Sequence, residues 1–335
     1  MEDTGTSHVY GIDRHTLCLT ALPSANSAQS LFALGTLGVH EPGEIHVVDL
    51  NTDDDVLHNT VFTHTSGIRA LSAWSEKELL VVNTEGSVEL VALPIAGETR
   101  VVATLEQTGR ASRVLSHTQR QAAVVTPGVG VAVWDMARVA AAAHSLAQDD
   151  VECAAWHPAS AAQLATGDTH GGVRTWDMRT AATAISCAHT GRVRALDYNP
   201  NRPYHLASGG CDGAMRIWDL RQPRGPLITA ANHTHWITAL QFNAFHDQLL
   251  VTAGSDALVS LESAVSVSSA GAADTHSADS TRPTDGLVRH YDAHESSVYA
   301  VQWSAADPWV FASLSFDGRL VISGVPREEK YKILL

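Results

Sequence analysis

The stretch LASGGCDGAMRIWD, from Leu206 to Asp219, contains the features that decide the fold. Small and apolar residues run from Leu206 to Gly210, and a second apolar run ends in the pair Trp218-Asp219. An Asp-Gly pair lies between the two runs and is a strong signal for a tight hairpin turn. We therefore predict two antiparallel strands here, and VRALDY, which precedes them, predicts another.

The same pattern occurs again at a constant interval. LATGDTHGGVRTWD ends in Trp176-Asp177, 42 residues before Trp218, and Trp134-Asp135 lies 42 residues earlier still. A period of about 40 to 45 residues with a terminal Trp-Asp pair is typical of WD40 blades, the four-stranded units of a β-propeller.

A second regularity links a histidine, a hydroxyl residue and an aspartate. The histidine precedes the aspartate by 23 residues, and the Ser or Thr lies four before the aspartate, in three sets: His189, Ser208 and Asp212; His233, Thr252 and Asp256; His294, Ser313 and Asp317. Units also end near Asp135 and Asp177, and weaker strand patterns at Ile45–Leu50 and within His64–Leu93 predict two more. The count gives an all-β, seven-bladed WD40 β-propeller, a single domain over residues 1–335.

We interpret the repeated residues as a structural relay. The histidine can bond the turn aspartate, while the hydroxyl and the tryptophan indole complete a network that ties one blade together. The unit with His189, Ser208, Asp212 and Trp218 has all four members. Glu262 and Ser323 stand where the tryptophan is expected in the two later units, and His170 stands at the turn aspartate of an earlier one.

Three segments leave the architecture open. His8–Leu22 and the tail Tyr331–Leu335 are alternative sources of the outer strand that closes the ring. Ala137–Ala147 reads either as a short helical turn or as an alanine-rich loop. The stretch 263–286, rich in Ser, Ala and Asp, predicts a disordered insert loop in the sixth blade.

Composition narrows the classes of partner. The chain has 36 acidic and 22 basic residues, a net charge of −14 that disfavours nucleic acid and anionic membranes. The N-terminus lacks the pattern of a signal peptide, and no apolar run approaches the length of a membrane span. Without such a run we expect no direct membrane insertion. The four scattered cysteines, without a C-x-x-C pair, predict reduced thiols in a cytosolic protein.

Two C-terminal stretches resemble a particular family. They are HTHWITALQFNAFHDQLLVTAGSDALVSL, from His233, and HESSVYAVQWSAADPWVFASLSFDGRLVISGVPREEKYKILL, from His294, with weaker similarity at YGID, ALGTLG and EIHVVDL. They are similar to the EARP and GARP complex-interacting proteins, a WD40 family. The resemblance implies a cytoplasmic adaptor that associates with the EARP and GARP tethering complexes at endosomes and the trans-Golgi network. It also implies a monomeric subunit of a larger assembly, with roles in endosomal recycling, retrograde transport and dense-core vesicle cargo sorting.

We expect partner-binding residues just after the relay histidines and just before the turn aspartates, because loops on a rigid scaffold commonly form the contacts with partners. These positions hold Arg192, Arg194, Trp236, Tyr299 and Phe316. Aromatic and Arg side chains together are typical of a binding hot spot. The alternative is that some of the rings fill gaps between blades.

A second hypothesis rests on W-D-x-R, which occurs at Trp176–Arg179 and Trp218–Arg221. This motif resembles that of substrate receptors of cullin-RING ubiquitin ligases, with Arg179 and Arg221 as the adaptor contacts. The alternative is a surface arginine paired with a neighbouring acid.

No catalytic, cofactor or metal site is predicted. His233 and His235 have the spacing of two metal ligands, but the sequence places no third, and we assign His233 to its relay. His189, Ser208 and Asp212 imitate a catalytic triad in composition only, since the set is repeated from blade to blade.

Overall fold

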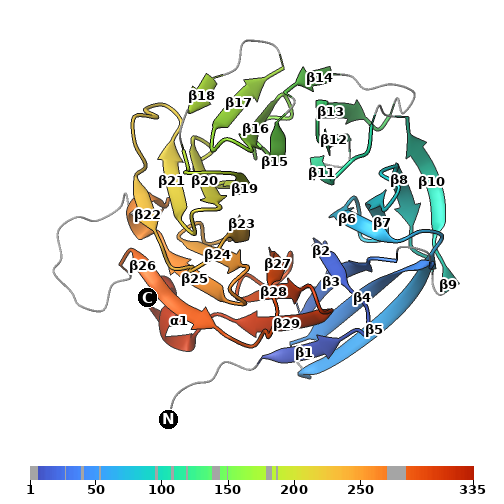
Figure 1. The fold of residues 1–335 in the computed structure, drawn as a ribbon. Coiled ribbons are helices and arrows are strands. Elements are labelled where there is room, and N and C mark those ends of the chain that lie inside the picture. The colour runs from blue at the N-terminus through green and yellow to red at the C-terminus, as the bar shows by residue number, and fades with distance from the viewer. Residues whose placement is uncertain are drawn as a thin grey trace.

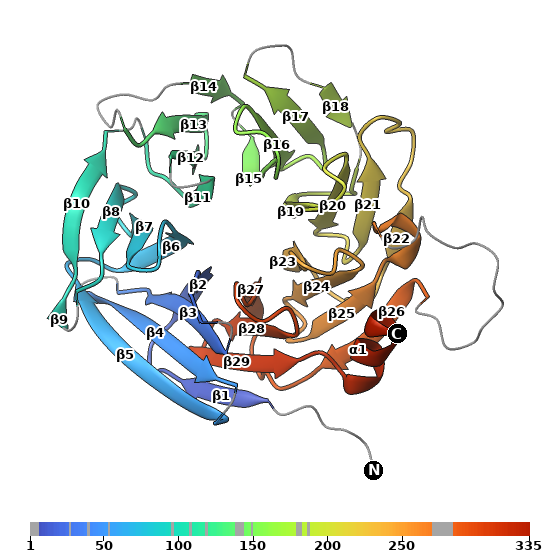
Figure 2. The same ribbon diagram turned by 180° about the vertical axis from the view of Figure 1, so that it is seen from behind.

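The computed structural model is a ring of seven sheets around a central axis (Figure 1). It describes residues 7–26, 28–38, 41–52, 54–94, 97–106, 109–117, 120–137, 144–148, 150–178, 183–185, 188–269 and 284–335. The predicted seven-bladed propeller is confirmed. The same ring seen from behind shows α1 and the C-terminus at its outer edge, beside β26 (Figure 2).

Each sheet runs from an inner strand at the axis to an outer strand at the rim. The first four sheets contain these strands: β2 (Thr16–Leu22), β3 (Gln29–Thr36), β4 (Gly43–Asn51) and β5 (Val56–His64); β6 (Ile68–Ala73), β7 (Glu78–Asn83), β8 (Val88–Ala92) and β10 (Arg100–Leu105); β11 (Arg113–His117), β12 (Gln121–Thr126), β13 (Gly130–Asp135) and β14 (His144–Ala147); β15 (Val151–Trp156), β16 (Gln163–Asp168), β17 (Val173–Asp177) and β18 (Thr183–Ile185). The short β9 (Gly97–Glu98) adds to β5 in parallel.

The last three sheets follow the same order. They contain β19 (Val193–Tyr198), β20 (His205–Gly210), β21 (Met215–Asp219) and β22 (Ile228–Ala230); β23 (Ile237–Phe242), β24 (Leu249–Gly254), β25 (Val259–Ser263) and β26 (Gly286–Tyr291); β27 (Val298–Trp303), β28 (Val310–Ser315), β29 (Arg319–Gly324) and β1 (His8–Gly11). The second strand of each sheet is buried over most of its length, and β20 and β24 are buried throughout, because neighbouring blades cover both of their faces.

The ring closes through the N-terminus. β1 pairs antiparallel with β29, with His8 opposite Ile322 and Gly11 opposite Arg319. The Tyr10 hydroxyl lies 3.0 Å from His46 Nδ1 on β4, and Asn59 Nδ2 donates to it at 2.8 Å. Of the two segments that the sequence left open, the start of His8–Leu22 therefore closes the last blade, while Thr16–Leu22 begins the first.

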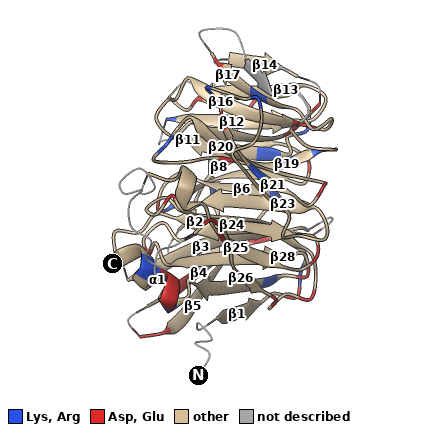
Figure 3. Ribbon diagram, turned by 90° about the vertical axis from the view of Figure 1, so that its left-hand side faces the viewer, with Lys and Arg blue, Asp and Glu red and all other residues tan. Residues whose placement is uncertain are grey.

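The C-terminal tail is not a strand. Arg327–Leu334 forms the helix α1, which follows Pro326, and its Ile333 packs against the core between the sixth and seventh blades. Proline cannot donate to a strand ladder, and Glu328 and Glu329 in the first turn favour a helix start. Viewed edge-on, the strands carry few charged residues, whereas α1 shows both signs (Figure 3).

Two further expectations are refined. His144–Ala147, part of the stretch read as helical turn or loop, forms the strand β14, while 138–143 lie outside the described residues. The insert begins with an ordered 3-10 turn, Val265–Val267, whose Val267 carbonyl accepts a hydrogen bond from His205 at 2.9 Å. Residues 270–283 lie outside the described residues.

Removal of residues 1–11 should destabilise the ring, because it exposes the edge of β29 and takes away a four-residue strand. Each ladder hydrogen bond contributes about 1 kcal/mol net. We expect the melting temperature to fall by about 5 °C or more, measured by scanning calorimetry. The exposed substitution Val9→Thr, which keeps the strand, is the control, and equal melting of the shortened and full chains would contradict closure by β1.

Candidate functional site

The relay of the fifth blade is a continuous chain of hydrogen bonds. The Trp218 indole donates to Ser208 Oγ at 2.8 Å, and Ser208 Oγ lies 2.7 Å from His189 Nε2. His189 Nδ1 lies 2.9 Å from Asp212 Oδ1, and Arg216 donates to the other carboxylate oxygen at 2.8 Å. Donation from indole to hydroxyl to imidazole to carboxylate gives each contact of the relay one donor and one acceptor. Arg216 Nη1 also lies 2.6 Å from His189 Nδ1.

Glycine makes this approach possible. A Cβ atom at Gly210, two residues before Asp212, would lie under 3.0 Å from both His189 and Asp212, and one at Gly254 would crowd His233 and Asp256 in the same way. The relay therefore needs a residue without a side chain at this position.

Charges in the relay are set by burial and by partners. Burial lowers the pKa of His189 against the opposing effect of Asp212, so the imidazole is neutral near pH 7. Burial by itself raises the pKa of Asp212, but bonds from His189 and Arg216 outweigh it and bring the value to about 2. A neutral His189 imidazole that donates to the ionised Asp212 carboxylate agrees with hydrogen bonds that run from the indole to the carboxylate.

The sixth blade keeps the geometry with a different last member. His233 Nδ1 lies 3.1 Å from Asp256, and its Nε2 lies 2.9 Å from Thr252 Oγ1. Thr252 lies 3.3 Å from Glu262, which occupies the tryptophan position. Burial raises the pKa of Glu262 to about 7, and a protonated carboxyl can donate to Thr252 as the indole does to Ser208.

The seventh blade breaks the predicted relay. His294 Nε2 lies 2.7 Å from Ser313, but no hydrogen bond joins His294 to Asp317, and His294 Nδ1 is buried without a partner. Ser315 stands where the fifth and sixth blades have Gly210 and Gly254, and its hydroxyl donates to Asp317 instead. The predicted His294–Asp317 bond is therefore wrong, because the Ser315 side chain takes the space between the two groups.

One end of the central axis is lined by residues that β-bulges point away from the ladders. In six of the seven inner strands one residue near the start is left out of register with the second strand: Leu17, Arg69, Glu152, Arg194, Thr238 and Tyr299. A bulge re-aims the side chain of its extra residue. Since neighbouring inner strands contact each other around the axis (Figure 1), these positions form a ring that we call the mouth.

The predicted partner-binding residues fall in or beside the mouth. Arg194 lies over the Trp236 ring, 5.5 Å from its centroid, and Phe316 lies near Tyr299 at 5.9 Å and stacks on His15 at 4.5 Å. Trp236 is 45% exposed and Phe316 36%. Arg192 is exposed and pairs with Glu152 at 3.6 Å. The structure thus forms one Arg–Trp pair and one aromatic cluster on the same face.

Sequence reasoning missed Arg69 and Arg113. Arg69 follows His64 by five residues, as Arg194 follows His189 and Tyr299 follows His294. That spacing would have identified Arg69, but the second blade lacks the turn aspartate that marks the relay. Arg113 opens β11, the inner strand of the third blade, and we include it in the mouth. The register of β11 has no bulge, so no sequence signal pointed to Arg113.

The described residues of the two W-D-x-R motifs lie on the opposite face, where β17 and β21 end. Arg221 is engaged in a bidentate pair with Asp219, at 2.7 Å for the closest atoms, and its guanidinium lies 3.6 Å from the Tyr204 ring centroid. Arg179 lies outside the described residues. The described arginine therefore fits the structural alternative, a surface arginine paired with a neighbouring acid.

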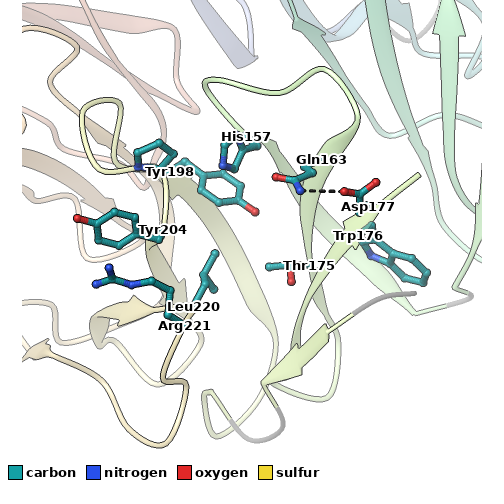
Figure 4. A pocket seen from close by; sticks show the side chains of 10 residues that line it. His157, Gln163, Thr175, Trp176, Asp177, Tyr198, Tyr204, Leu220 and Arg221 are labelled. Carbon is teal, nitrogen blue, oxygen red and sulfur yellow. Dashed lines mark hydrogen bonds between the residues drawn. The ribbon is translucent and has the colours of Figure 1, made fainter. Parts of the chain in front are cut away.

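A pocket of about 390 Å³ opens beside Arg221, between the fourth and fifth blades. Side chains of the two blades face each other across it, among them Gln163, which donates to Asp177 at 2.9 Å, and the ring of Tyr198 (Figure 4). The equivalent gap between the fifth and sixth blades is filled by Val267 of the insert.

The structure gives His233 a role in its relay and shows no metal site at His233 and His235. Both ring nitrogens of His233 are in hydrogen bonds, so the His233–His235 spacing leaves His233 no lone pair for a metal. Across the described part of the chain no group of three or more potential ligands could hold a metal ion. Cys18, Cys153 and Cys211 are free thiols, and Cys187 lies outside the described residues.

No helix among the described residues has the length and apolar character needed to cross a bilayer.

Comparison with known proteins identifies the family. The family described as EIPR1 beta-propeller matches residues 4–261, and the WD domain, G-beta repeat, matches residues 286–322. The chain belongs to the EIPR1 beta-propeller family. The first of these matches covers most of the propeller, from the closing strand to the sixth blade.

Curated relatives match over a shorter stretch. An EARP-interacting protein homolog from Gekko japonicus is 46% identical over 124 residues, which cover 33% of this chain and 32% of the relative. The EARP and GARP complex-interacting protein 1 of Homo sapiens is 44% identical over 124 residues, with the same coverage, and EARP-interacting protein 1 of Caenorhabditis elegans is 44% identical over 110 residues, 30% of each chain. The matched stretch therefore spans about a third of the length of these relatives.

In this EIPR1-type propeller, Asp212→Ala should lower the free energy of unfolding by about 1–3 kcal/mol, because His189 Nδ1 and Arg216 lose a buried acceptor. Urea unfolding measures the change. Asp317→Ala is the matched control and should cost less, since Asp317 does not bond its histidine. Equal stability of Asp212→Ala and wild type would refute the relay.

Glu262→Gln tests the protonated carboxyl. The pKa of Glu262 rises from 4.5 to about 7 on folding, so the folded state binds more protons between these values and stability falls as pH rises through that window. The glutamine variant should be more stable than wild type by about 1–3 kcal/mol at pH 8, with a much smaller difference at pH 5. Urea unfolding at both values, beside the exposed control Glu328→Gln, measures this, and a pH-independent difference would contradict it.

Proposed function

We propose that this chain is a non-catalytic adaptor whose mouth face binds subunits of the EARP and GARP tethering complexes. Membership of the EIPR1 beta-propeller family and the names of its relatives support this partner. The adaptor would act in endosomal recycling, retrograde transport to the trans-Golgi network and dense-core vesicle cargo sorting. It would be cytoplasmic and reach these membranes through its partners.

The observation that carries the proposal is the exposed aromatic and Arg cluster on a rigid ring. The Arg194 guanidinium lies 5.5 Å from the centroid of the Trp236 ring, and the Trp236 backbone carbonyl accepts a hydrogen bond from the Ser255 N–H at 2.9 Å. A large exposed ring in a fixed place loses little conformational entropy when a partner covers it. The cluster has the composition and rigidity of a binding hot spot.

The relay residues argue for scaffolding rather than catalysis. Ser208 is fully buried, and its oxygen lies between the Trp218 indole and His189. Both nitrogens of His189 are also engaged. A nucleophile and its base need access to a substrate, and this pair has none. We do not propose the ligase-receptor function, because Arg221 is committed to Asp219 and Tyr204.

Trp236→Ala should abolish or strongly reduce recovery of tethering-complex subunits without lowering the melting temperature, because Trp236 contributes exposed contact area rather than core. Affinity purification of the tagged full chain from its own cells, with mass spectrometry, measures recovery. Phe245→Ala is the matched control: Phe245 is 52% exposed in the β23–β24 loop, on the opposite face. Unchanged recovery with Trp236→Ala, or recovery of a cullin adaptor in place of tethering subunits, would overturn the proposal.

A further inference from the structure

We propose that the mouth recognises an acidic segment of a protein partner, with carboxylates held by Arg69, Arg113 and Arg194 and an adjacent apolar residue held by Trp236, Tyr299 and Phe316. The inference rests on the proposed function and names the chemistry of the segment that this face accepts. It assigns an acidic ligand to these arginines, although the whole chain has a net charge of −14.

The three arginines, which we call the cationic arc, come from the second, third and fifth blades, and Glu152 of the fourth blade lies between Arg113 and Arg194. Arg69 and Arg113 lie at the starts of the contacting inner strands β6 and β11. Arg113 reaches across the fourth blade, where its guanidinium donates to the Arg194 carbonyl oxygen at 3.3 Å. Arg113 and Arg194 both lower the pKa of the buried Cys153 thiol electrostatically, and Glu152 raises it.

Among the described residues, the three arginines of the arc differ in their counterions from four other arginines nearby in the fold or the sequence. Arg192, Arg216, Arg221 and Arg319 each have a carboxylate within 4.0 Å. Among the described residues, no carboxylate lies within ion-pair distance of Arg69, Arg113 or Arg194. The nearby Glu152 pairs with Arg192 instead. In an acidic protein, an unneutralised cationic arc is complementary to an acidic ligand.

Arg194 adds an independent observation. Its Nε is buried and has no hydrogen-bond acceptor. A buried donor that stays unpaired costs free energy, and a carboxylate placed in the mouth would accept from it. The guanidinium fork matches a carboxylate in two parallel hydrogen bonds, which a lysine could not reproduce.

The aromatic half of the mouth defines the rest of the ligand. Trp236, Tyr299 and Phe316 belong to the sixth and seventh blades, beside Arg194 of the fifth. The Arg194–Trp236 contact joins the cationic arc to this aromatic half. A segment that spans both halves therefore carries Asp or Glu next to a large apolar residue.

The probe is a library of random 12-residue peptides displayed on phage and selected on the immobilised full chain. We expect selected peptides to be enriched in Asp or Glu beside Phe, Leu or Trp. A fluorescein-labelled selected peptide should bind about tenfold or more weakly to Arg113→Gln and to Arg194→Gln in fluorescence anisotropy. Arg120→Gln, which removes an exposed arginine from the β11–β12 loop of the opposite face, should leave its affinity unchanged. Unfolding curves of each variant exclude loss of fold.

Several results would overturn the inference. Enrichment of basic or uncharged peptides, equal binding after Glu→Gln exchange in the peptide, or insensitivity to both arginine variants would each do so. Tighter binding of the phosphoserine version would assign the arc to a different ligand. If tethering subunits still depend on Trp236 while selected peptides show no acidic preference, the proposed function stands and the inference fails. If acidic peptides bind as expected but recovery of tethering subunits does not depend on Trp236, the inference stands and the proposed function fails.

Discussion

The pairing of β1 with β29 is the constraint on which the rest of the structure depends. Seven sheets in a ring have one seam, and without β1 the last blade would present an open edge. Further contacts reinforce it: Thr16 donates to the Ser315 carbonyl at 3.0 Å, and Ile12 N–H to the Gly318 carbonyl at 3.0 Å. Because the inner strands take their places from this closure, the mouth residues of non-adjacent blades depend on it as well.

Within the closed ring, the fifth, sixth and seventh blades build related hydrogen-bond networks from different residues. The fifth blade uses a full chain from indole to carboxylate, and the sixth replaces the indole with a carboxyl group of raised pKa. The seventh loses one bond because Ser315 replaces a glycine, and it gains cover from α1. A network that is common to the blades but not identical in them supports the interpretation that these residues hold the scaffold together.

The two faces differ in what their arginines do. On the opposite face Arg221 is satisfied within the protein by Asp219 and Tyr204. At the mouth, Arg69, Arg113 and Arg194 have no carboxylate partner in the described part of the chain, and exposed rings stand beside them. An unsatisfied cationic and aromatic surface on a rigid support favours recognition of another protein at the mouth.

The residues within each repeat specify its local structure, so the sequence by itself predicts much of the fold. A period of 42 residues, the Asp-Gly turn and the Trp-Asp ending specify hairpins whose faces can be buried only by neighbouring copies, and these patterns alone predicted seven blades and the relay of the fifth. Long-range contacts decided the rest. Only pairing across the ring shows that β1, not the tail, closes it, and only the space between His294 and Asp317 shows that Ser315 separates them. Arg113 and Arg194 are 81 residues apart, and nothing local in either predicts that one donates to the other, because that contact exists only once the ring has closed.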